Sequence, residues 1–573
     1  MKKAVAYLLT GTMVLSLTAC LPNVNVSLGD KDTNNGVANL SGNDISGDGE
    51  NTENGGNNEN GNDENQSGEQ NTVNNTEEVN SNFTVKYEGY PQWSAYDYPV
   101  HTDYFENSEG KSIEKVSVEF TKMYISSGEY NDNQYKELAD AIKEMNLENE
   151  TALMETYEGF LSDWDEMFAE AELDWGPALY EIDHKGVVRA DQKVFSIMCD
   201  SEAYYGGAHG GNYLGSHNYY SQTGKEIAFE DVVVKTEGLE KIIVDELYDH
   251  YDKEIFFEET REGLEKEVKN YLDTGIGWTI NNFGVAFYFG DYALAAYASG
   301  HQIVYINFDK YPEYLNPEFF KDADEEYVIH ATDCVYLPMF FNGEEGNITF
   351  NWERSYNAEG DFYSETYQIL NVYGDPFGYQ ELKLDGSLMD PAVYIVRKNN
   401  NDYLYVTNYY FDGVESLQVF EYKNGQFEEV RDLSGGITFE TSKLEEVQFS
   451  ANGSFASNFA FSHTTFSVGD DGMPVLGDVY YYDLYDGWQD DYYYVAKSDI
   501  KGFEMGSDGK PSDKELTLKK GTKLYPFATD QDTYIVLVDV DDNYYAFNIG
   551  WDSYEMTINK KATYSLFEME SNW

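Results

Sequence analysis

The sequence changes sharply in composition at residue 83. Residues 22–82 are mostly Asn, Gly, Glu, Asp, Ser and Thr and contain no aromatic residue, and Phe83 is the first aromatic side chain after them. So little apolar surface cannot offset the entropy that is lost when a chain becomes ordered. We therefore expect residues 20–82 to form a disordered acidic linker, roughly 40–50 Å from end to end. All folded structure is expected after it.

The N-terminus has the form of a secretion signal. Lys2 and Lys3 precede an apolar stretch at 4–17, which is too short to span a bilayer. The stretch ends in Leu-Thr-Ala-Cys20, which resembles a bacterial lipobox, in which the cysteine carries palmitate-type acyl chains and the peptide is cut before it. We expect a signal peptide at 1–19 and a lipid anchor on Cys20, holding the protein on the extracytoplasmic face of a bacterial cell membrane. An ordinary signal peptide that contains a cysteine is the alternative.

The net charge restricts the partners. The chain has 105 acidic and 37 basic side chains, a formal charge of −68. A field of this sign opposes binding to nucleic acid and to anionic membrane surfaces, and it favours cationic proteins, amines and divalent metals. Composition names no reaction.

Two cysteines remain besides the lipidated one. Outside the cell, Cys199 and Cys334 could form one disulfide. Cys199 also lies in an apolar run, where a buried free thiol is equally natural.

Residues 83–311 alternate between strand and helix patterns. Apolar residues alternate at 116–120, and helical spacing follows at 135–145 and 153–168, which predicts a strand and two successive helices. Further strands are predicted at 193–199, 285–289 and 303–308, with helical spacing at 239–251 and 264–271. We expect an α+β fold, with the helices on one face of an antiparallel sheet.

Five short motifs in this region carry a family resemblance. They are Arg189-Ala190-Asp191, Tyr204-Tyr205-Gly206-Gly207-Ala208-His209-Gly210, the segment 218–225, the segment 283–289 and the segment 292–300. Together they resemble the RsiV-like domain, the extracytoplasmic module of lysozyme-sensing anti-sigma factors, which is also found in peptidoglycan deacetylases of the PdaC type. The resemblance covers about 40% of the chain.

The resemblance implies an α+β fold and, in the sensor branch, binding of lysozyme, a strongly cationic protein. An acidic module suits such a partner through electrostatic steering. We find no transmembrane helix or cytoplasmic anti-sigma segment, so signalling by that route is not expected. We also find no deacetylase domain downstream.

The second half of the chain has the pattern of short strands. Asn-Gly and Asp-Gly pairs, which favour tight hairpin turns, begin at residues 342, 385, 412, 424, 471, 486 and 508. We expect an all-β domain at 322–510, as a meander, a sandwich or a few propeller-like blades. A small β domain is expected at 511–573, where the pattern resembles an SH3-like barrel.

The glycine-rich motif is the candidate binding site. Tyr204 and Tyr205 flank Gly206 and Gly207, whose flexibility permits a tight loop, and His209 can donate or accept a hydrogen bond. The functional interpretation is a rigid binding loop with an aromatic rim. The structural interpretation is a turn in which His209 bonds nearby backbone.

We expect no catalytic residue, metal or cofactor. His209, His217 and Glu202 could share a metal, but the spacing fits no zinc motif. No nucleophile elbow is present. The acidic cluster at 539–542 does not fit a calcium loop and is expected to be solvated loop charge.

Two runs of three tyrosines, at 480–482 and 492–494, remain. Adjacent side chains in a strand point to opposite faces, so some of these rings are expected at the surface. They could stack on sugar or anchor a protein, or they could be ordinary strand residues.

These features predict a non-catalytic surface lipoprotein that binds a ligand of the cell envelope. The first candidate partner is a cationic lysozyme-like protein. The alternatives are a module that binds wall glycan (peptidoglycan) and a hydrolase with a site near His209.

Overall fold

The computed structural model describes residues 89–571 except for 108, 127–133, 169–178, 207–208, 322–325, 333–334, 342–343, 356–366, 376, 385–390, 411–412, 438–443, 445–446, 457, 483–491 and 553–554. The predicted signal peptide, Cys20, the linker and Cys334 lie outside these residues. The described chain is mostly β, and all of its α-helices except α7 (Thr563–Leu566) precede residue 275.

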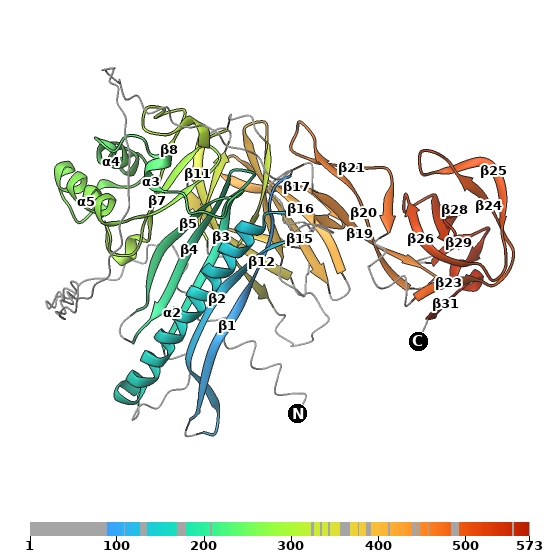
Figure 1. Ribbon diagram of the computed structural model, residues 1–573, viewed down its shortest axis with the longest axis horizontal. Coiled ribbons are helices and arrows are strands. Elements are labelled where there is room, and N and C mark those ends of the chain that lie inside the picture. Colours follow the sequence, from blue (N-terminus) through green and yellow to red (C-terminus); the bar gives the residue numbers. More distant parts are fainter. Residues whose placement is uncertain are drawn as a thin grey trace, which may run out of the picture. The chain divides into compact units, whose positions relative to one another are not determined.

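The first layer is a five-stranded sheet covered by a long helix. Its elements are β1 (Gln92–Glu106), β2 (Ser112–Ser126), α2 (Lys136–Phe168), β3 (Leu179–Ala190), β4 (Val194–Tyr204) and β5 (Gly211–Tyr220). The strands lie in sequence order, and α2 lies along the sheet (Figure 1). β2 and β3 pair in parallel, whereas the other pairs are antiparallel. The expectation of a wholly antiparallel sheet is wrong at this pair, because α2 carries the chain back over the sheet before β3 begins.

α2 is one continuous helix, whereas the spacing predicts two. No glycine or proline lies between residues 145 and 153, so nothing interrupts the backbone hydrogen bonds. Asn146, in the first half of the helix, is buried and bonds both backbone groups of Met123 in β2. The change in apolar spacing therefore marks a polar contact with the sheet and not a helix end.

Helices α4 and α5 cover a second, three-stranded antiparallel sheet. The elements are α3 (Phe229–Val232), α4 (Leu239–His250), α5 (Arg261–Thr274), β6 (Gly277–Ile280), β7 (Gly284–Phe289) and β8 (Gln302–Asn307). Short 3₁₀ turns lie at Lys253–Ile255, Tyr297–Ser299 and Pro317–Phe319. Leu247 of α4, Leu264 of α5 and Phe287 of β7 belong to one buried cluster. The predicted helices and strands of this part are confirmed.

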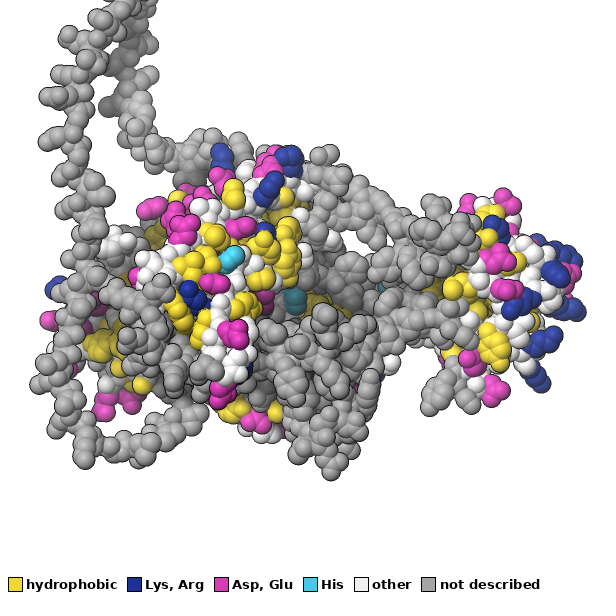
Figure 2. Space-filling view, turned by 90° about the horizontal axis from the view of Figure 1, so that it is seen from below, with side chains coloured by type: hydrophobic (Ala, Val, Ile, Leu, Met, Phe, Trp, Pro, Cys, Tyr) yellow, Lys and Arg dark blue, Asp and Glu magenta, His cyan; other side chains and the backbone are white. Residues whose placement is uncertain are grey.

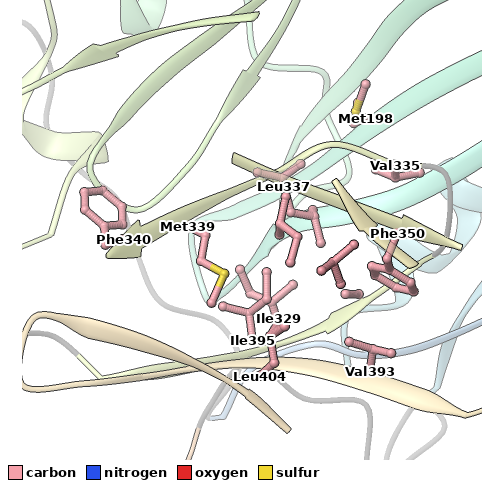
Figure 3. Packing of buried hydrophobic residues seen from close by; sticks show 14 of the residues in the cluster. Met198, Ile329, Val335, Leu337, Met339, Phe340, Phe350, Val393, Ile395 and Leu404 are labelled. Carbon is pink, nitrogen blue, oxygen red and sulfur yellow. The ribbon is translucent and has the colours of Figure 1, made fainter. Parts of the chain in front are cut away.

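The next part is a sandwich of two antiparallel sheets. One contains β10 (Leu337–Phe341), β11 (Glu344–Ser355), β12 (Tyr367–Asp375) and β13 (Gly378–Leu384). The other has the order β17 (Gln426–Ser434), β16 (Gly413–Lys423), β15 (Asn401–Tyr410), β14 (Ala392–Lys398) and β9 (Tyr327–Ala331). Leu337 and Met339 of the first sheet pack with Ile395 and Leu404 of the second (Figure 3).

The sandwich shares its core with the preceding part of the chain. Val188 of β3, Met198 of β4 and Tyr288 of β7 belong to the same buried cluster as Val335 and Ile395. A Cβ added at Gly186 would lie 2.7 Å from a methyl group of Val335, so β3 approaches this segment closely. The cluster thus includes residues on both sides of position 311.

The five-stranded sheet of the sandwich is buried on both faces. Its other face packs Tyr394, Tyr405 and Val419 against Phe449 and Phe466. Those two residues belong to β19 (Gln448–Phe455) and β20 (Asn458–Val468), which pair with each other. β18 (Gly436–Ile437) pairs with β19, and β21 (Pro474–Leu476) pairs with β20. Burial on both faces explains why β14 reads Ala-Val-Tyr-Ile-Val without alternation.

The Asn-Gly and Asp-Gly pairs that the structure describes in full lie at hairpin turns. Asn424 and Gly425 connect β16 to β17 with φ of 53° and 88°, which is the left-handed pair that a type I′ turn requires. Gly472 and Gly509 have φ of 75° and 77° in the turns after β20 and β24. The pairs that begin at 342, 385, 412 and 486 lie wholly or partly outside the described residues.

The C-terminal strands form a further all-β part. They are β22 (Tyr480–Tyr482), β23 (Tyr492–Ala496), β24 (Ile500–Met505), β25 (Pro511–Leu518), β26 (Lys523–Thr529), β27 (Tyr534–Asp539), β28 (Tyr544–Asp552), β29 (Glu555–Ile558), β30 (Lys561–Ala562) and β31 (Phe567–Ser571). Ile535, Leu537, Phe547 and Ile558 share its buried core. β24 and β25 form one hairpin across residue 510.

Within the described residues, no helix has both the length and the apolar character that crossing a bilayer requires.

Candidate functional site

The glycine-rich motif forms the connection between β4 and β5. Gly206 has φ of 82°, a left-handed conformation that glycine adopts without strain. A Cβ added at Gly210 would lie 2.8 Å from the carbonyl oxygen of Ala203, so the two arms of the connection approach closely. Gly207 lies outside the described residues. The predicted tight loop between two strands is confirmed for the described positions.

His209 packs beside two tyrosines that come from a distant segment and also contact each other. Its ring stacks on Tyr297 at a centroid distance of 4.3 Å and on Tyr292 at 5.9 Å. Its Nδ1 lies 2.6 Å from the carbonyl oxygen of Gly210, and its Nε2 lies 3.0 Å from the hydroxyl of Tyr292. Because a carbonyl only accepts, Nδ1 carries the proton in this arrangement and Nε2 accepts from the tyrosine. His209 therefore bonds nearby backbone, as the structural interpretation expects, and it also joins a second motif. The binding role of the loop stays a prediction.

We use the name tyrosine cluster for Tyr204, Tyr205, His209, Tyr292 and Tyr297, of which His209, Tyr292 and Tyr297 are in direct ring contact with one another. Tyr205 and Tyr292 are 59% and 53% exposed, so large aromatic faces remain open to solvent. Tyr292 has φ of 62°, a positive value that is common for glycine and uncommon for a bulky residue. Backbone strain of this kind persists only where the surrounding structure imposes it, and it concentrates at functional sites.

Tyr205 is fixed from the side of α2. Its ring packs on Phe160 at 5.2 Å, and its hydroxyl donates to Glu181 at 3.0 Å. Burial and the neighbouring carboxylate raise the pKa of Tyr205 to about 12, so the hydroxyl stays protonated at neutral pH.

The carboxylate of Glu202 is linked to the tyrosine cluster through Tyr180. The hydroxyl of Tyr180 donates to Glu202 at 2.6 Å, and the Tyr180 ring stacks on Tyr204. Burial raises the pKa of Glu202 above its usual value, although the bond from Tyr180 opposes this shift. Each group stabilises the other, because a hydrogen bond offsets the cost of burying a polar atom.

A second buried polar group lies behind the segment that carries Tyr292. His301 and Asp291 are 7% exposed, and their side chains approach to 3.3 Å. The backbone N–H of Asn212 donates to Asp291 at 3.2 Å, and the amide of Asn212 donates to Asp200 at 3.1 Å. Asp291 thus ties the segment before Tyr292 to the start of β5, which fixes the two halves of the tyrosine cluster to each other.

The histidines weighed for catalysis or metal binding have partners within the fold. Both nitrogens of His209 are hydrogen bonded, one to the Gly210 carbonyl oxygen and one to the Tyr292 hydroxyl. His217 stacks on Tyr219, and burial lowers the pKa of His217. Among the described residues, no group of three His, Cys, Asp or Glu side chains is arranged to hold a metal ion.

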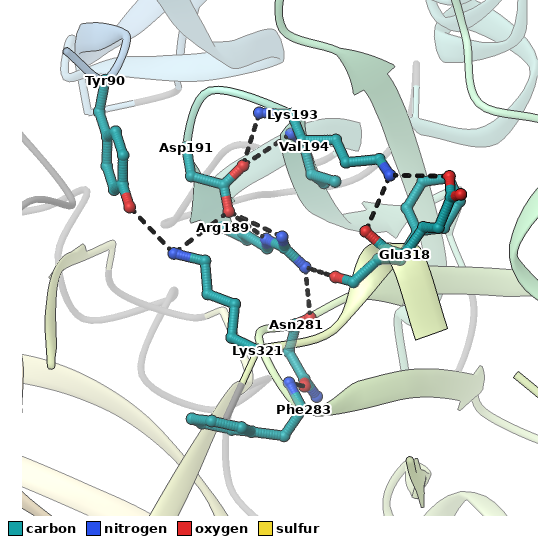
Figure 4. A network of polar contacts seen from close by, with 10 residues as sticks. Tyr90, Arg189, Asp191, Lys193, Val194, Asn281, Phe283, Glu318 and Lys321 are labelled. Carbon is teal, nitrogen blue, oxygen red and sulfur yellow. Dashed lines mark hydrogen bonds and ion pairs between the residues drawn. The ribbon is translucent and has the colours of Figure 1, made fainter. Parts of the chain in front are cut away.

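The Arg189-Ala190-Asp191 motif has a structural role. Arg189 pairs with Asp191 and also donates to the carbonyl oxygens of Asn281 and Phe319 (Figure 4). The other oxygen of Asp191 accepts the backbone N–H groups of Lys193 and Val194. The motif therefore closes the turn between β3 and β4 and joins it to two later loops.

The remaining candidates resolve into ordinary contacts. Asp539 accepts hydrogen bonds from the backbone of Asp541 and Asn543, so its carboxylate organises a turn. In the first tyrosine run, Tyr482 is 7% exposed and Tyr481 is 40% exposed, which confirms that adjacent rings point to opposite faces. Cys199 is buried with a free thiol.

Sequence reasoning singled out the loop but not its partners. Tyr292 and Tyr297 belong to a motif that contributes to the family resemblance, yet nothing in their spacing links them to His209. His301 and Asp291 gave no signal, because their contact depends on the path of the chain between β7 and β8.

Comparison with known proteins gives partial likenesses only. No protein-family model matches the chain, and no curated protein matches it. A solved structure of a DUF3298 family member from Bacteroides fragilis NCTC 9343 is 18% identical, covers 40% of this chain and 94% of its own, and has a TM-score of 0.30. A DUF3298 family protein from Pseudomonas aeruginosa PAO1 is 15% identical, covers 40% and 96%, and has a TM-score of 0.25. Both are named for a domain of unknown function.

Proposed function

We propose that this chain is a non-catalytic cell-surface lipoprotein whose tyrosine cluster binds a cationic protein, with a lysozyme-like protein as the first candidate. The observation that carries the proposal is the exposed ring of Tyr292, which is held in a left-handed backbone conformation against His209. Tyrosine is enriched at the energetic centres of protein interfaces.

The local chemistry favours a cation as the contacting group. Glu181 accepts a hydrogen bond from Tyr205, and Asp291 accepts one from the backbone of Asn212. Glu202 accepts one from Tyr180, whose ring stacks on Tyr204. Exposed tyrosine faces attract Lys and Arg side chains by cation–π interaction, worth about 0.5–1 kcal/mol at exposed sites. The −68 charge of the chain would steer a cationic partner toward the protein.

The test is calorimetric titration of the full chain with a cationic lysozyme at several salt concentrations. We expect binding that persists above physiological ionic strength, because packed aromatic contacts are not screened as surface charges are. Tyr292→Ala should weaken binding about tenfold or more, which corresponds to about 1.4 kcal/mol. The matched control is Tyr564→Ala, since Tyr564 is 51% exposed in α7 and should leave the affinity unchanged.

Two results would overturn this proposal. Affinity that vanishes with salt would mean charge attraction without a shaped interface. Equal losses in the two tyrosine variants would mean that the tyrosine cluster is not the contact surface.

A second candidate function is wall-glycan binding by the β-rich half. The exposed ring of Tyr481, packed edge-on against Phe527 at 5.7 Å, offers one fixed aromatic face for a sugar. Sedimentation with purified peptidoglycan tests this function, and Tyr481→Ala should release the protein to the supernatant. Protein that never sediments would reject it.

A further inference from the structure

The C-terminal part of this acidic chain carries a lysine face. Residues 497–501, 519–523 and 559–566 contain seven lysines and one acidic residue, Asp499, whereas the whole chain has 37 basic and 105 acidic side chains. All seven lysines are exposed. We call them the lysine face: Lys497, Lys501, Lys519, Lys520, Lys523, Lys560 and Lys561.

Hydrogen bonds join the three segments into one surface. The backbone N–H of Lys497 donates to the carbonyl oxygen of Leu566 at 2.8 Å, and the N–H of Gly521 donates to Ala496 at 2.8 Å. The amide of Asn559 donates to the carbonyl oxygen of Lys501 at 3.0 Å. Lysines that are distant in sequence therefore lie side by side, and Figure 2 shows Lys and Arg side chains gathered at the right of the view.

Most of this positive charge has no ion-pair partner among the residues that the structure describes. Lys519 pairs with Asp499 at 2.9 Å, and Lys523 lies over the ring of Tyr493 at 3.8 Å. Lys501, Lys520, Lys560 and Lys561 form no ion pair with any residue that the structure describes. At physiological ionic strength the screening length is about 8 Å, so the face presents its own charge in spite of the acidic remainder.

We infer that the lysine face binds a linear polymer of phosphodiesters. Lysine is a flexible point charge that suits phosphate, and the region 497–571 contains no arginine for bidentate recognition. The lysines are spread over the three segments and do not surround one pocket. This arrangement suits an extended ligand with regularly spaced charges. The face does not include the tyrosine cluster, so this site is independent of the function proposed above.

The test is binding of the full chain to immobilised poly(glycerol phosphate) near physiological salt. The variant replaces Lys501, Lys520, Lys560 and Lys561 by Gln. The control replaces four exposed lysines of the helical region, Lys235, Lys241, Lys253 and Lys266, by Gln and changes the net charge equally. We expect the wild type and the control to bind alike, and the variant to bind about tenfold more weakly or worse.

Three probes identify the ligand class. Poly-glutamate that binds as tightly would show that the face recognises charge without preference for phosphate, and oligothymidylate that binds more tightly would assign it to nucleic acid. Phosphatidylglycerol vesicles whose binding falls in the variant would assign it to a membrane. Each of these results overturns the inference.

A second measurement holds even if the variant misfolds. In the wild-type chain, poly(glycerol phosphate) should protect the lysine face from acetylation, read lysine by lysine by mass spectrometry. Lys241 and Lys266 should react at an unchanged rate. Equal protection everywhere, or none, would refute the site.

Discussion

Arg189 and Asp191 form an ion pair across a single intervening residue, with 2.7 Å between Nη2 of Arg189 and Oδ2 of Asp191. Both side chains are almost fully buried, and the pair also holds the carbonyl oxygens of Asn281 and Phe319. The charge of Arg189 and the bonds from the turn outweigh burial and keep the pKa of Asp191 below its usual value. One pair thus connects the β3–β4 turn with the loops before β7 and before β9.

Replacing Arg189 by Ala should destabilise the protein strongly. The substitution removes the main cationic partner of the buried Asp191 carboxylate, leaving the ion pair with Lys321 at 3.5 Å, and it removes the donor of two carbonyl oxygens. Breaking a buried pair in this way costs about 3–5 kcal/mol. Urea unfolding measures the loss.

The control for Arg189 is an arginine with ion pairs at the surface. Arg261 pairs with Asp245 and Glu265 but is largely exposed, so Arg261→Ala should cost about 1 kcal/mol or less. Similar losses in the two variants would show that burial does not set the strength of the Arg189 pair.

Gly224→Ala should also be destabilising, because two independent costs meet at this residue. Its φ is 62°, and a Cβ would lie 2.1 Å from the carbonyl oxygen of Glu137 at the start of α2. The left-handed conformation alone costs about 1–2 kcal/mol, and the clash requires the backbone of α2 to move. Thermal unfolding should show a larger loss than for Gly425→Ala, since Gly425 has φ of 88° and nothing within 4 Å of its Cβ position. Equal losses would mean that α2 adjusts freely.

The sequence predicts much of the local structure. The apolar spacing at 239–251 and 264–271 locates α4 and α5, because each helix buries one face against the sheet beneath it. Asn424-Gly425 predicts its turn, because both residues must adopt positive φ.

The same patterns do not contain the pairing between distant segments. The parallel pairing of β2 with β3, the single long α2 and the contact of His209 with Tyr292 each depend on where the chain returns in space. The buried ion pair of Lys185 with Asp183 is likewise invisible in sequence, since both residues look like ordinary surface charges until α2 covers them. Local propensity determines the elements, and tertiary packing determines which motifs meet.

Cys199 should resist alkylation in the folded protein. Burial and the neighbouring carboxylates raise the pKa of its thiol to about 12, so the reactive thiolate is scarce at neutral pH. Iodoacetamide should leave Cys199 unmodified in the folded protein. It should modify Cys199 once the protein is denatured, with no reductant needed, as peptide mass spectrometry would show. Labelling that requires a reductant would instead demonstrate a disulfide, with Cys334 as the expected partner.

The pair of His301 with Asp291 should make stability depend on pH. Burial opposes the charge of His301, but the hydrogen bond that the ring donates to Asp291 and the charge of Asp200 outweigh it, so the pKa of His301 is raised above 6.5 in the folded state. The contribution of His301 to the free energy of unfolding is therefore fully present below pH 6.5 and is lost as pH rises through the folded-state pKa. That contribution is about 1.4 kcal/mol for each unit by which folding raises the pKa. The excess stability of the wild type over His301→Gln, from urea unfolding, should be larger at pH 5.5 than at pH 9.

His217→Gln is the control, with the opposite pH trend expected. Burial lowers the pKa of His217, so protonating it at low pH destabilises the folded protein. The substitution should therefore raise the stability at acid pH and change it less at high pH. A pH trend of the same sign in both variants would contradict this assignment.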